Sequence, residues 1–578
     1  MVLEFFNILG FNIFGNVIEE VPRDLTVLTE IGIIIIIATF LAFLVRIIKQ
    51  PLIPAYIITG IIMGPLVLGL IKDPQIISSL SQIGIAFLIF TAGIEIKFKK
   101  LREVGNVSTI GGILQIVILF FIAFLVSIWL GFSGKAPIYI GLIVAFSSTM
   151  IVVALLQRRG EIDSLHGRII IGILLIQDIV AIIALAILSS DLSINSIIIV
   201  LFKAFIFGIF AFILSKIGNF FFSKAADEKE LLLIVSISFL FLFVIGAFIS
   251  NLSLIIGAFF AGVALANSDY KIEIQSLISP LREFFSVIFF VALGMQLQLI
   301  PKEFLLSFLI LLILVIILKP IVIMFLVRIF GYKKRTAFLT GNALGQTSEF
   351  SFIIATIGLS IGHITSELFS TLILLTILTM SLSNYFINYD RRLIWLSWPL
   401  DILDKLGHSR EELEYFEKDR RKVILFGCHR MGSLILKEFE KNKQEISVVD
   451  YNPQIIKFLI NKKIPCIYGD FMHDEILDRI NIKNAEIVIS TVPDFEDNMS
   501  LIRKMNKLNK EAKVIVVASR ISEALELYKQ GADYVILPKF IGGEVARSII
   551  KKASNNEWLK KIRNEHKKRL ESLHYLLY

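Results

Sequence analysis

Apolar residues form long runs through the first two-thirds of the chain, and short polar or basic segments separate one run from the next. The hydrocarbon core of a bilayer is about 30 Å thick, so an α-helix needs about 20 apolar residues to cross it. The runs long enough to cross lie at 25–47, 52–71, 77–97, 107–131, 137–157, 167–189, 195–222, 230–250, 252–268, 284–300, 303–329, 336–358 and 362–387. The pattern therefore predicts a polytopic α-helical membrane protein of about 13 spans.

A different pattern begins near residue 421, where short β-branched runs alternate with helical segments. Strands are expected at 423–427, 446–450, 464–468, 486–490, 513–518 and 533–537. Because strands separated by helices form a doubly wound parallel sheet, we expect a Rossmann-like α/β domain. The expected divisions are an N-terminal segment at 1–23, a transmembrane domain at 24–388, a linker at 389–420, the α/β domain at 421–555 and a basic amphipathic helix at 556–578.

Composition supports this division and excludes other classes of protein. The 578 residues are 56% hydrophobic and 19% charged, with a mean hydropathy of +0.78, which excludes a soluble globular protein. The net charge of +9 does not indicate nucleic-acid binding, because much of the excess lies in loops between spans. The two cysteines, Cys428 and Cys466, both fall in the α/β domain, so no disulfide framework is expected.

Loop charges predict the orientation in the membrane. Loops that follow odd-numbered spans are rich in Lys and Arg, whereas the other loops hold little beyond Arg23, Lys72, Lys135 and Lys302. Cytoplasmic loops carry the excess of basic residues. The N-terminus is therefore expected outside, and the linker, the α/β domain and the last helix in the cytoplasm.

A weak internal repeat relates spans that lie seven apart. The stretch LIFTAGIEI (88–96) of the third span matches FFVALGMQL (289–297) of the tenth, and the second span matches the ninth in its small residues. Seven is odd, so the two copies run in opposite directions across the membrane. Inverted repeats are typical of secondary transporters, which bind their cargo at the repeat interface.

Asp178 lies in the middle of the sixth span, next to Gln177, within the apolar stretch GILLIQDIVAII (172–183). Placing a carboxylate at this depth in the membrane costs roughly several kcal/mol of free energy. Its presence therefore indicates a water-filled cavity, a partner residue or a cargo that makes use of the charge. The alternative is a polar residue that joins two helices by a hydrogen bond.

The fifth and twelfth spans, also seven apart, both contain polar stretches. The fifth carries Ser147, Ser148 and Thr149, and the twelfth carries GNALGQTSEF (341–350), with Gln346 and Glu349. Such stretches interrupt helices and free carbonyls for an ion site, although packing of small residues is the simpler alternative.

Lys319 is a further deep charge. It lies nine residues before Arg328, roughly 13 Å along the helix, a depth similar to that of Asp178. It is either part of the ion site or a structural counter-charge to Asp178 or Glu349.

These residues suit the exchange of a cation for a proton. Burial raises the pKa of a carboxyl group, whereas a nearby cation lowers it, so a half-buried Asp178 binds either a proton or a monovalent cation. Hydroxyl groups and freed carbonyls can complete the oxygen ligands of K⁺ or Na⁺.

In the α/β domain, the first strand leads into the loop GCHRMG (427–432). Gly427 and Gly432 match the first and last glycines of a dinucleotide fingerprint, but His429 replaces the middle one. His429 and Arg430 could supply positive charge instead, next to Met431. Asp450 ends the second strand, where an acid hydrogen-bonds ribose hydroxyls. The loop predicts nucleotide binding; the alternative is a Rossmann-like fold without a ligand.

The membrane half resembles the monovalent cation:proton antiporters of the second superfamily branch, and Kef-type K⁺/H⁺ antiporters most of all. The resemblance lies in QPLIPAYIITGIIMGP (50–65), FTAGIEI (90–96), 147–149, 177–178, GAFFAG (257–262), FFVALGM (289–295) and GQTSEF (345–350). It implies a Na⁺/H⁺ antiporter-like fold, with Asp178 as the ion-binding residue and the fifth and twelfth spans as unwound, crossing helices. Relatives with two adjacent acids tend to be electrogenic, so Gln177 implies electroneutral exchange. Lys319 is similar to a lysine that balances charge beside the site.

The same resemblance implies a regulator of pH homeostasis in the plasma membrane. In Kef-type systems an acidic loop before the tenth span takes part in glutathione gating. Here that loop has Gln275, Leu277 and Ser279 where acids are expected, so glutathione control is not expected. A small cytosolic ancillary subunit is a further implied partner.

The α/β domain resembles the RCK/KTN regulatory domains of potassium transport proteins, including IYGDFMHDEIL (467–477) with Asp470. This implies an adenine nucleotide (AMP or ATP) or NAD(H) as regulatory ligand, and a homodimer.

Three other functions stay open at the level of sequence. A Na⁺/H⁺ antiporter would use the same residues. An RCK-gated K⁺ channel would need a TVGYG-like filter, which the sequence lacks. A membrane-anchored NAD-dependent enzyme would need a catalytic acid–base pair beside the nucleotide loop, which the sequence does not show. A bare anchor would also have no use for Asp, Glu and Lys inside the membrane.

Overall fold

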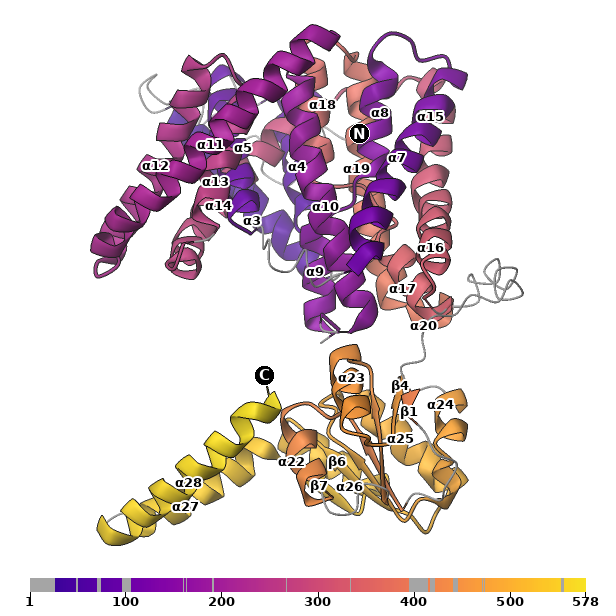
Figure 1. The fold of residues 1–578 in the computed structure, drawn as a ribbon. Helices are drawn as coiled ribbons and strands as arrows, with labels where there is room; N and C mark the ends of the chain where they lie inside the picture. The colour runs from indigo at the N-terminus through magenta and orange to yellow at the C-terminus, as the bar shows by residue number, and fades with distance from the viewer. Residues whose placement is uncertain are drawn as a thin grey trace. The chain divides into compact units, whose positions relative to one another are not determined.

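The computed structural model describes residues 26–47, 50–69, 74–95, 105–159, 161–162, 164–189, 192–266, 268–332, 334–393, 414–415, 422–439, 445–469, 471, 474–552 and 556–577. The chain forms two compact units, which divide near residue 410, except that residues 163–165 group with the second unit (Figure 1). The elements that the structure describes in the first unit are all helices, and the second unit is built around a sheet.

All thirteen expected spans are helical. Eleven contain α3 (Thr26–Ile47), α4 (Ile53–Met63), α5 (Pro74–Glu95), α7 (Gly105–Trp129), α10 (Leu165–Leu188), α11 (Ile194–Ala225), α12 (Lys229–Ile249), α13 (Leu254–Leu265), α14 (Lys271–Met295), α15 with α16 (Lys302–Ile313, Lys319–Ile329) and α19 (Ser366–Asn388). Among the described residues, nine helical stretches are long and apolar enough to cross a membrane, and four apolar helices are shorter. Many apolar side chains of α11 are exposed, as expected of a surface that faces lipid.

The two remaining spans are interrupted. The fifth consists of α8 (Ala136–Ala145) and α9 (Thr149–Arg158), and the twelfth of α17 (Lys334–Ala343) and α18 (Phe350–Ser360). The eleventh span changes to a π-helical turn at Leu314–Leu318, just before Pro320. Because proline lacks an N–H donor and its ring clashes with the preceding turn, a regular α-helix is disfavoured at this point. The π-helical turn leads directly to Lys319.

Two close helix crossings reflect the inverted repeat. α4 of the second span crosses α14 of the tenth at Gly60 and Gly294, where a Cβ on Gly294 would lie 2.9 Å from the Cα of Gly60. α5 of the third span crosses α13 of the ninth at Gly93 and Gly262, where a Cβ on Gly262 would lie 2.8 Å from the Cα of Gly93. In the repeat, the second span corresponds to the ninth and the tenth to the third. The crossing of the second and tenth spans therefore corresponds to the crossing of the ninth and third. Glycine at these four positions lets the backbones touch.

The described residues of the second unit form a seven-stranded sheet in the order β1-β4-β3-β2-β5-β6-β7. The six expected strands are all present and parallel, as β2 (Val423–Phe426), β3 (Ile446–Asp450), β4 (Cys466–Tyr468), β5 (Ile487–Ser490), β6 (Lys513–Val517) and β7 (Tyr534–Ile536). The seventh strand, β1 (Glu414–Tyr415), comes from residues expected in the linker and pairs antiparallel with β4. The sheet order reverses at β2, so the strands on either side of it frame a crevice at their carboxyl ends.

Helices flank the sheet and continue beyond it. They are α22 (Arg430–Glu438), α23 (Pro453–Asn461), α24 (Asp474–Arg479), α25 (Phe495–Leu508), α26 (Ile521–Lys529), α27 (Pro538–Lys552) and α28 (Asn556–Leu577). Buried residues cover both faces of the sheet, including Phe426 on one face and Leu425 on the other. α27 and α28 lie side by side and extend away from the sheet (Figure 1).

Candidate functional site

The two interrupted spans meet at their breaks. The Ser147 hydroxyl, in the break between α8 and α9, donates a 2.9 Å hydrogen bond to the carbonyl of Leu344, in the break between α17 and α18. The backbone N–H of Ser147 donates to Oε1 of Gln177, at 2.9 Å. Ser147 therefore joins three of the four polar segments that the sequence singled out, and Gln177 acts as a neutral acceptor for a backbone group.

Lys319 lies at the same crossing and satisfies carbonyls that the breaks leave free. Its ammonium donates to the carbonyls of Val144 at 2.9 Å, Phe146 at 2.7 Å and Gln346 at 2.7 Å. An ammonium has three N–H donors, so these three hydrogen bonds use all of them. The Lys319 side chain is fully buried. Its described contacts are thus with backbone dipoles at the crossing and not with Asp178.

Two carboxyl groups lie at the N-terminal end of α9. The Thr149 hydroxyl lies 3.0 Å from each carboxylate oxygen of Asp178 and donates to them. The next residue, Met150, donates its N–H to Oε1 of Glu349, at 3.4 Å. The charges of Asp178 and Glu349 interact with each other. The first turn of α9 therefore presents a hydroxyl to Asp178 and a backbone N–H to Glu349.

The candidate residues differ in accessibility. Asp178 and Thr149 are partly exposed, whereas Ser147, Ser148, Gln177, Lys319, Gln346 and Glu349 are buried. Ser148 caps α9 by accepting a hydrogen bond from the N–H of Ile151. Thr149 and Asp178 are therefore the more accessible members of this set.

Several buried polar atoms lack a hydrogen-bond partner within the described part of the chain. They are Oε2 of Glu349, Nε2 of Gln177 and both side-chain heteroatoms of Gln346. A buried polar atom without a partner costs about 1–3 kcal/mol. A cation, a proton or ordered water at these atoms would recover part of this cost.

Sequence reasoning missed a hydroxyl pair beside the break. The hydroxyls of Thr347 and Thr379 lie 3.0 Å apart, and the N–H of Thr347 donates to Thr379 at 3.4 Å. Thr379 lies on α19 together with Thr376 and Ser383, which are also buried. Hydroxyl residues that recur at helical spacing within an apolar span were the signal that could have identified it.

In the second unit, the loop between β2 and α22 is shaped by two glycines. Gly427 has a φ of +80°, a conformation that glycine adopts readily. A Cβ on Gly432 would lie 2.9 Å from the carbonyl carbon of Gly427, so the first turn of α22 packs directly against the loop. The Thr491 hydroxyl, after β5, donates to the carbonyl of Gly427 at 2.9 Å. These contacts place the N-terminus of α22 at the sheet crevice, a position that favours phosphate.

Asp450 holds this loop from the end of β3. Its two carboxylate oxygens accept the N–H groups of Cys428 at 2.6 Å and Asn452 at 2.7 Å. Burial raises the pKa of Asp450, although these N–H groups and the charge of His429 partly offset the effect. Burial also raises the pKa of the Cys428 thiol to about 12, with a contribution from the Asp450 charge. Cys428 is therefore a poor nucleophile at neutral pH.

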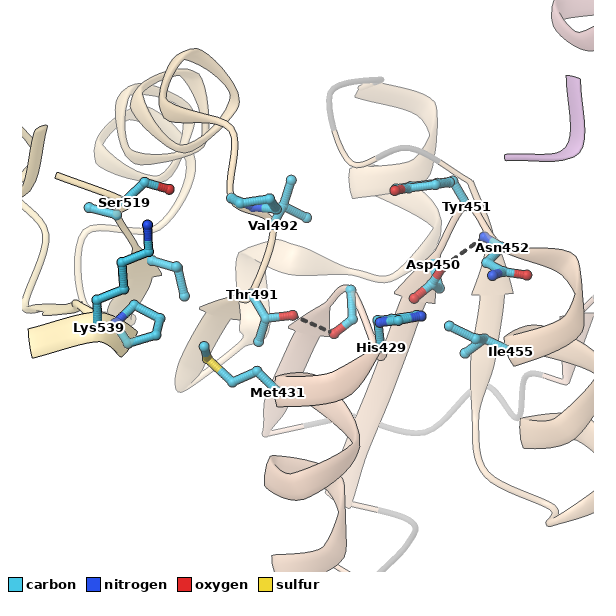
Figure 2. A pocket seen from close by; sticks show the side chains of 15 residues that line it. His429, Met431, Asp450, Tyr451, Asn452, Ile455, Thr491, Val492, Ser519 and Lys539 are labelled. Carbon is cyan, nitrogen blue, oxygen red and sulfur yellow. Dashed lines mark hydrogen bonds between the residues drawn. The ribbon is translucent and has the colours of Figure 1, made fainter. Parts of the chain in front are cut away.

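A pocket of about 410 Å³ opens at the carboxyl ends of the strands. Figure 2 shows Asn452 and Ile455 on one side of it, Ser519 and Lys539 on the other, and His429 and Thr491 between them. Gly427, Met431 and Asp450 also line it. The side chain of Arg430 and all of Asp470 fall outside the described residues. The pocket has the size of a small-molecule site and lies where Rossmann-like folds bind nucleotides.

Comparisons with known proteins cover both units. The family model described as "Sodium/hydrogen exchanger, transmembrane" matches residues 8–387, and the TrkA-N domain model matches residues 423–538. The protein YbaL of Escherichia coli (strain K12) is 24% identical over 540 residues, which cover 89% of this chain and 95% of that protein. K(+) efflux antiporter 4 of Arabidopsis thaliana is 29% identical over 376 residues, which cover 62% of this chain and 62% of the plant protein.

The membrane fold is similar to that of a solved antiporter structure. The sodium proton antiporter MjNhaP1 from Methanocaldococcus jannaschii, at pH 8, superimposes with a TM-score of 0.51 and 17% sequence identity, over 64% of this chain and 97% of that chain. At this identity the likeness concerns the fold alone. It confirms the antiporter-like fold expected of the membrane half, and the TrkA-N match confirms the RCK-type resemblance of the α/β domain.

Proposed function

Because the chain belongs to the sodium/hydrogen exchanger family, we propose that it exchanges K⁺ for protons, one for one, at Asp178, under the control of a nucleotide bound to the TrkA-N domain. At the coarser level the chain is a cation/proton antiporter, a multi-pass membrane protein with a soluble C-terminal domain. The family is one of transporters and not of enzymes.

The observation that carries the proposal is the contact between Thr149 and Asp178. A single partly exposed carboxylate stands at the start of a half-helix, with the Thr149 hydroxyl 3.0 Å from both oxygens. Such a hydroxyl donates to the bare carboxylate and can present its oxygen to a cation that replaces the proton. A site that holds one cargo at a time couples the two transport steps without further machinery.

One-for-one exchange depends on which groups change protonation. Gln177 carries no charge, so Asp178 has no acidic neighbour in sequence. Glu349 is the second carboxyl group nearby, and its charge interacts with that of Asp178. Electroneutral exchange therefore requires Glu349 to keep the same protonation state throughout the cycle.

The central test is Asp178→Asn in proteoliposomes that contain a pH-sensitive dye. Because asparagine cannot exchange a proton for a cation, we expect cation-dependent proton movement to be abolished. Asp269→Asn is the matched control, since Asp269 is exposed between α13 and α14, and its variant should transport like the unmodified protein. Full exchange by Asp178→Asn would contradict the assignment.

The ion is tested by comparing K⁺ and Na⁺ in the same assay. Support for K⁺ comes from similarity to a K(+) efflux antiporter, whereas the family description names sodium. Faster dequenching with K⁺ at equal concentration supports the proposal, and a preference for Na⁺ makes the protein a Na⁺/H⁺ antiporter. Unitary current steps in a planar bilayer would instead favour the RCK-gated channel.

Nucleotide control is tested by calorimetric titration of the full chain with AMP, ATP and NADH. The pocket at Gly427, His429 and Asp450 supports binding of an adenine nucleotide. His429→Ala, which removes an exposed side chain from the pocket wall, should weaken binding severalfold without unfolding the domain. No heat with any of the three ligands would contradict this part of the proposal.

We further propose a homodimer in the plasma membrane, with the N-terminus outside, the TrkA-N domain in the cytoplasm and a small cytosolic subunit as an additional partner. The distribution of basic loops supports the orientation. Protease digestion of sealed, right-side-out vesicles should leave the C-terminal domain intact. Cleavage of that domain would show that the protein has the opposite orientation.

A further inference from the structure

α9 is a helix of ten residues that is tied by side chains at both ends. At its N-terminal end, Thr149 contacts Asp178. At its C-terminal end, Arg159 caps the helix and reaches across to the end of α19. The same short helix therefore connects the proposed ion site with the C-terminal end of α19.

Arg159 makes three short contacts there. Nη1 donates to the carbonyl of Ile387 at 2.7 Å and lies 2.8 Å from Oδ2 of Asp390. Nη2 lies 2.9 Å from Oε1 of Glu161. Asp390 begins the short helix α20 (Asp390–Leu393), within the residues expected to form the linker, and it is 4% exposed. A guanidinium shared in this way fixes direction as well as distance, because its donors lie in one plane.

Neighbouring charges extend the cluster to further helices. Nε2 of His166, at the start of α10, lies 3.3 Å from Oε2 of Glu161. The charge of Arg335, at the start of α17, also acts on Glu161. The ends of α9, α10, α17 and α19 therefore meet in one polar cluster around Arg159, and α9, α10 and α17 are elements that build the proposed ion site. In Figure 1 the labels α9, α17 and α20 fall at the same end of the membrane unit.

Because α9 is short and unbroken, a movement of its C-terminal end is carried to its N-terminal end. Ten residues rise about 15 Å, and an unbroken α-helix of this length moves as a rigid rod. A shift of Arg159 therefore displaces Thr149 relative to Asp178, which belongs to a different helix. Hydrogen bonds weaken steeply when distance and angle change, so a small shift is sufficient to alter the oxygen arrangement around the cation.

We propose that Arg159 is a positioning residue for the ion site: through α9 it couples the position of Asp390, just after the end of α19, to the contact between Thr149 and Asp178. This inference rests on the proposed role of Asp178. It gives the soluble domain a mechanical route to the affinity for the cation, since any pull on the chain at Asp390 reaches Thr149.

A simpler role for Arg159 is to stabilise the C-terminal end of α9, where a positive charge interacts favourably with the helix dipole. The two roles predict different measurements. A purely structural contact changes the amount of folded protein and its melting temperature. A positioning contact also changes the cation concentration that gives half-maximal exchange by the folded protein.

The experiment measures that concentration for Asp390→Asn in the full-length protein in proteoliposomes, with the folded fraction determined by size-exclusion chromatography. We expect an increase of about fivefold or more, the effect of losing one hydrogen bond of ordinary strength, with the maximal rate within about twofold. Asp390→Glu, which can still reach Arg159, should recover part of the affinity. Asp269→Asn is the matched control and should leave the half-maximal concentration unchanged.

Arg159→Lys is the second variant, in case Asp390→Asn folds poorly. It keeps the positive charge at the end of α9, but an ammonium cannot hold the planar arrangement with Asp390, Ile387 and Glu161. The same increase in half-maximal concentration is expected. An unchanged value in either folded variant, or an equal increase in Asp269→Asn, overturns the proposal. Retained exchange by Asp178→Asn would instead refute the ion-site assignment, and this is a separate result.

Discussion

Lys319 is the charged residue most deeply enclosed by the crossing helices. Its ammonium donates to the carbonyls of Val144, Phe146 and Gln346, which the breaks leave without regular helical partners, so the breaks depend on Lys319. Asp178, by contrast, is partly exposed and accepts from a hydroxyl. The two residues therefore differ in their surroundings: Lys319 holds the crossing together, and Asp178 is accessible to the proposed cargo ion.

Lys319→Met should therefore destabilise the protein. Three buried carbonyls lose a charged donor, and at about 1–3 kcal/mol for each unsatisfied group the loss is at least about 3 kcal/mol. We expect a clear drop in the melting temperature of the purified protein in detergent. Lys203→Met is the matched control, because Lys203 lies on exposed α11 and donates one hydrogen bond, to Ser250. Equal melting temperatures for Lys319→Met and the control would show that the carbonyls are satisfied in another way.

At the scale of elements, the glycine crossings determine how closely the helices approach. Gly294 lies against Ile57 and Gly60, and Gly262 lies against Phe90 and Gly93, so each helix contacts the backbone of its partner. Backbone cannot move aside as the end of a flexible side chain can. The two equivalent crossings therefore give the membrane unit a rigid frame beside the interrupted helices.

Gly294→Ala tests this frame. Its methyl group would meet the carbonyl of Ile57 and the Cα of Gly60, and overpacking of this kind costs about 1–3 kcal/mol. We expect a lower melting temperature in detergent. Gly32→Ala, in α3, adds the same methyl group where nothing lies within 4 Å and should have no such effect. A melting temperature for Gly294→Ala equal to that of Gly32→Ala would mean that the helices can separate without cost.

Glu161, in the loop between α9 and α10, should make the stability of the folded protein fall at acid pH. Burial by itself raises the pKa of Glu161, but its hydrogen bond to His166 and the charges of His166, Arg159 and Arg335 outweigh burial and hold the pKa below 4.5. A carboxyl group whose pKa is lower in the folded state stabilises the fold above its unfolded pKa. This stabilisation disappears as the pH falls through the folded pKa.

Glu161→Gln should therefore lower stability by about 1 kcal/mol at neutral pH, the usual contribution of a partly exposed ion pair. The difference from the unmodified protein should shrink as the pH falls below about 4.5, where glutamate also becomes protonated. Melting curves at a series of pH values test this expectation. A difference that stays constant, or grows, towards acid pH would contradict the sign of the effect.

At the scale of the whole molecule, the chain consists of two compact units with separate hydrophobic cores. A ligand that binds one folded unit stabilises that unit by mass action, by about 2.7 kcal/mol at a hundred times its dissociation constant. The proposed nucleotide pocket lies entirely within the second unit.

Nucleotide should therefore shift one unfolding transition and not the other. In scanning calorimetry of the full chain, we expect AMP, ATP or NADH to raise the transition of the soluble unit and to leave that of the membrane unit in place. Gly432→Ala, whose methyl group would strike the carbonyl of Gly427, should remove the shift. If nucleotide still raises the transition of the soluble unit in Gly432→Ala, the nucleotide binds outside this pocket.

Much of this architecture follows from local pattern. Apolar runs of sufficient length form helices in a membrane, because each backbone group must find its partner within its own segment, and β-branched runs between helices form a parallel sheet. The thirteen spans, the six parallel strands, the breaks at 146–148 and 344–349 and the turn at Gly427 were therefore all accessible from sequence. β1 was not, since two residues carry no periodicity and their pairing depends on the edge that β4 offers.

Sequence alone determined which residues carry charge or polar groups inside the membrane, because the cost of burying such groups makes them conspicuous in an apolar run. It did not determine their partners. Only the tertiary structure decided that Lys319 binds carbonyls of two separate spans, that Thr149 contacts Asp178 and that Arg159 reaches the end of α19. These contacts join residues 27 to 228 positions apart. Hydrophobic periodicity reports the environment of each residue, whereas the choice of partner depends on how the whole set of helices packs.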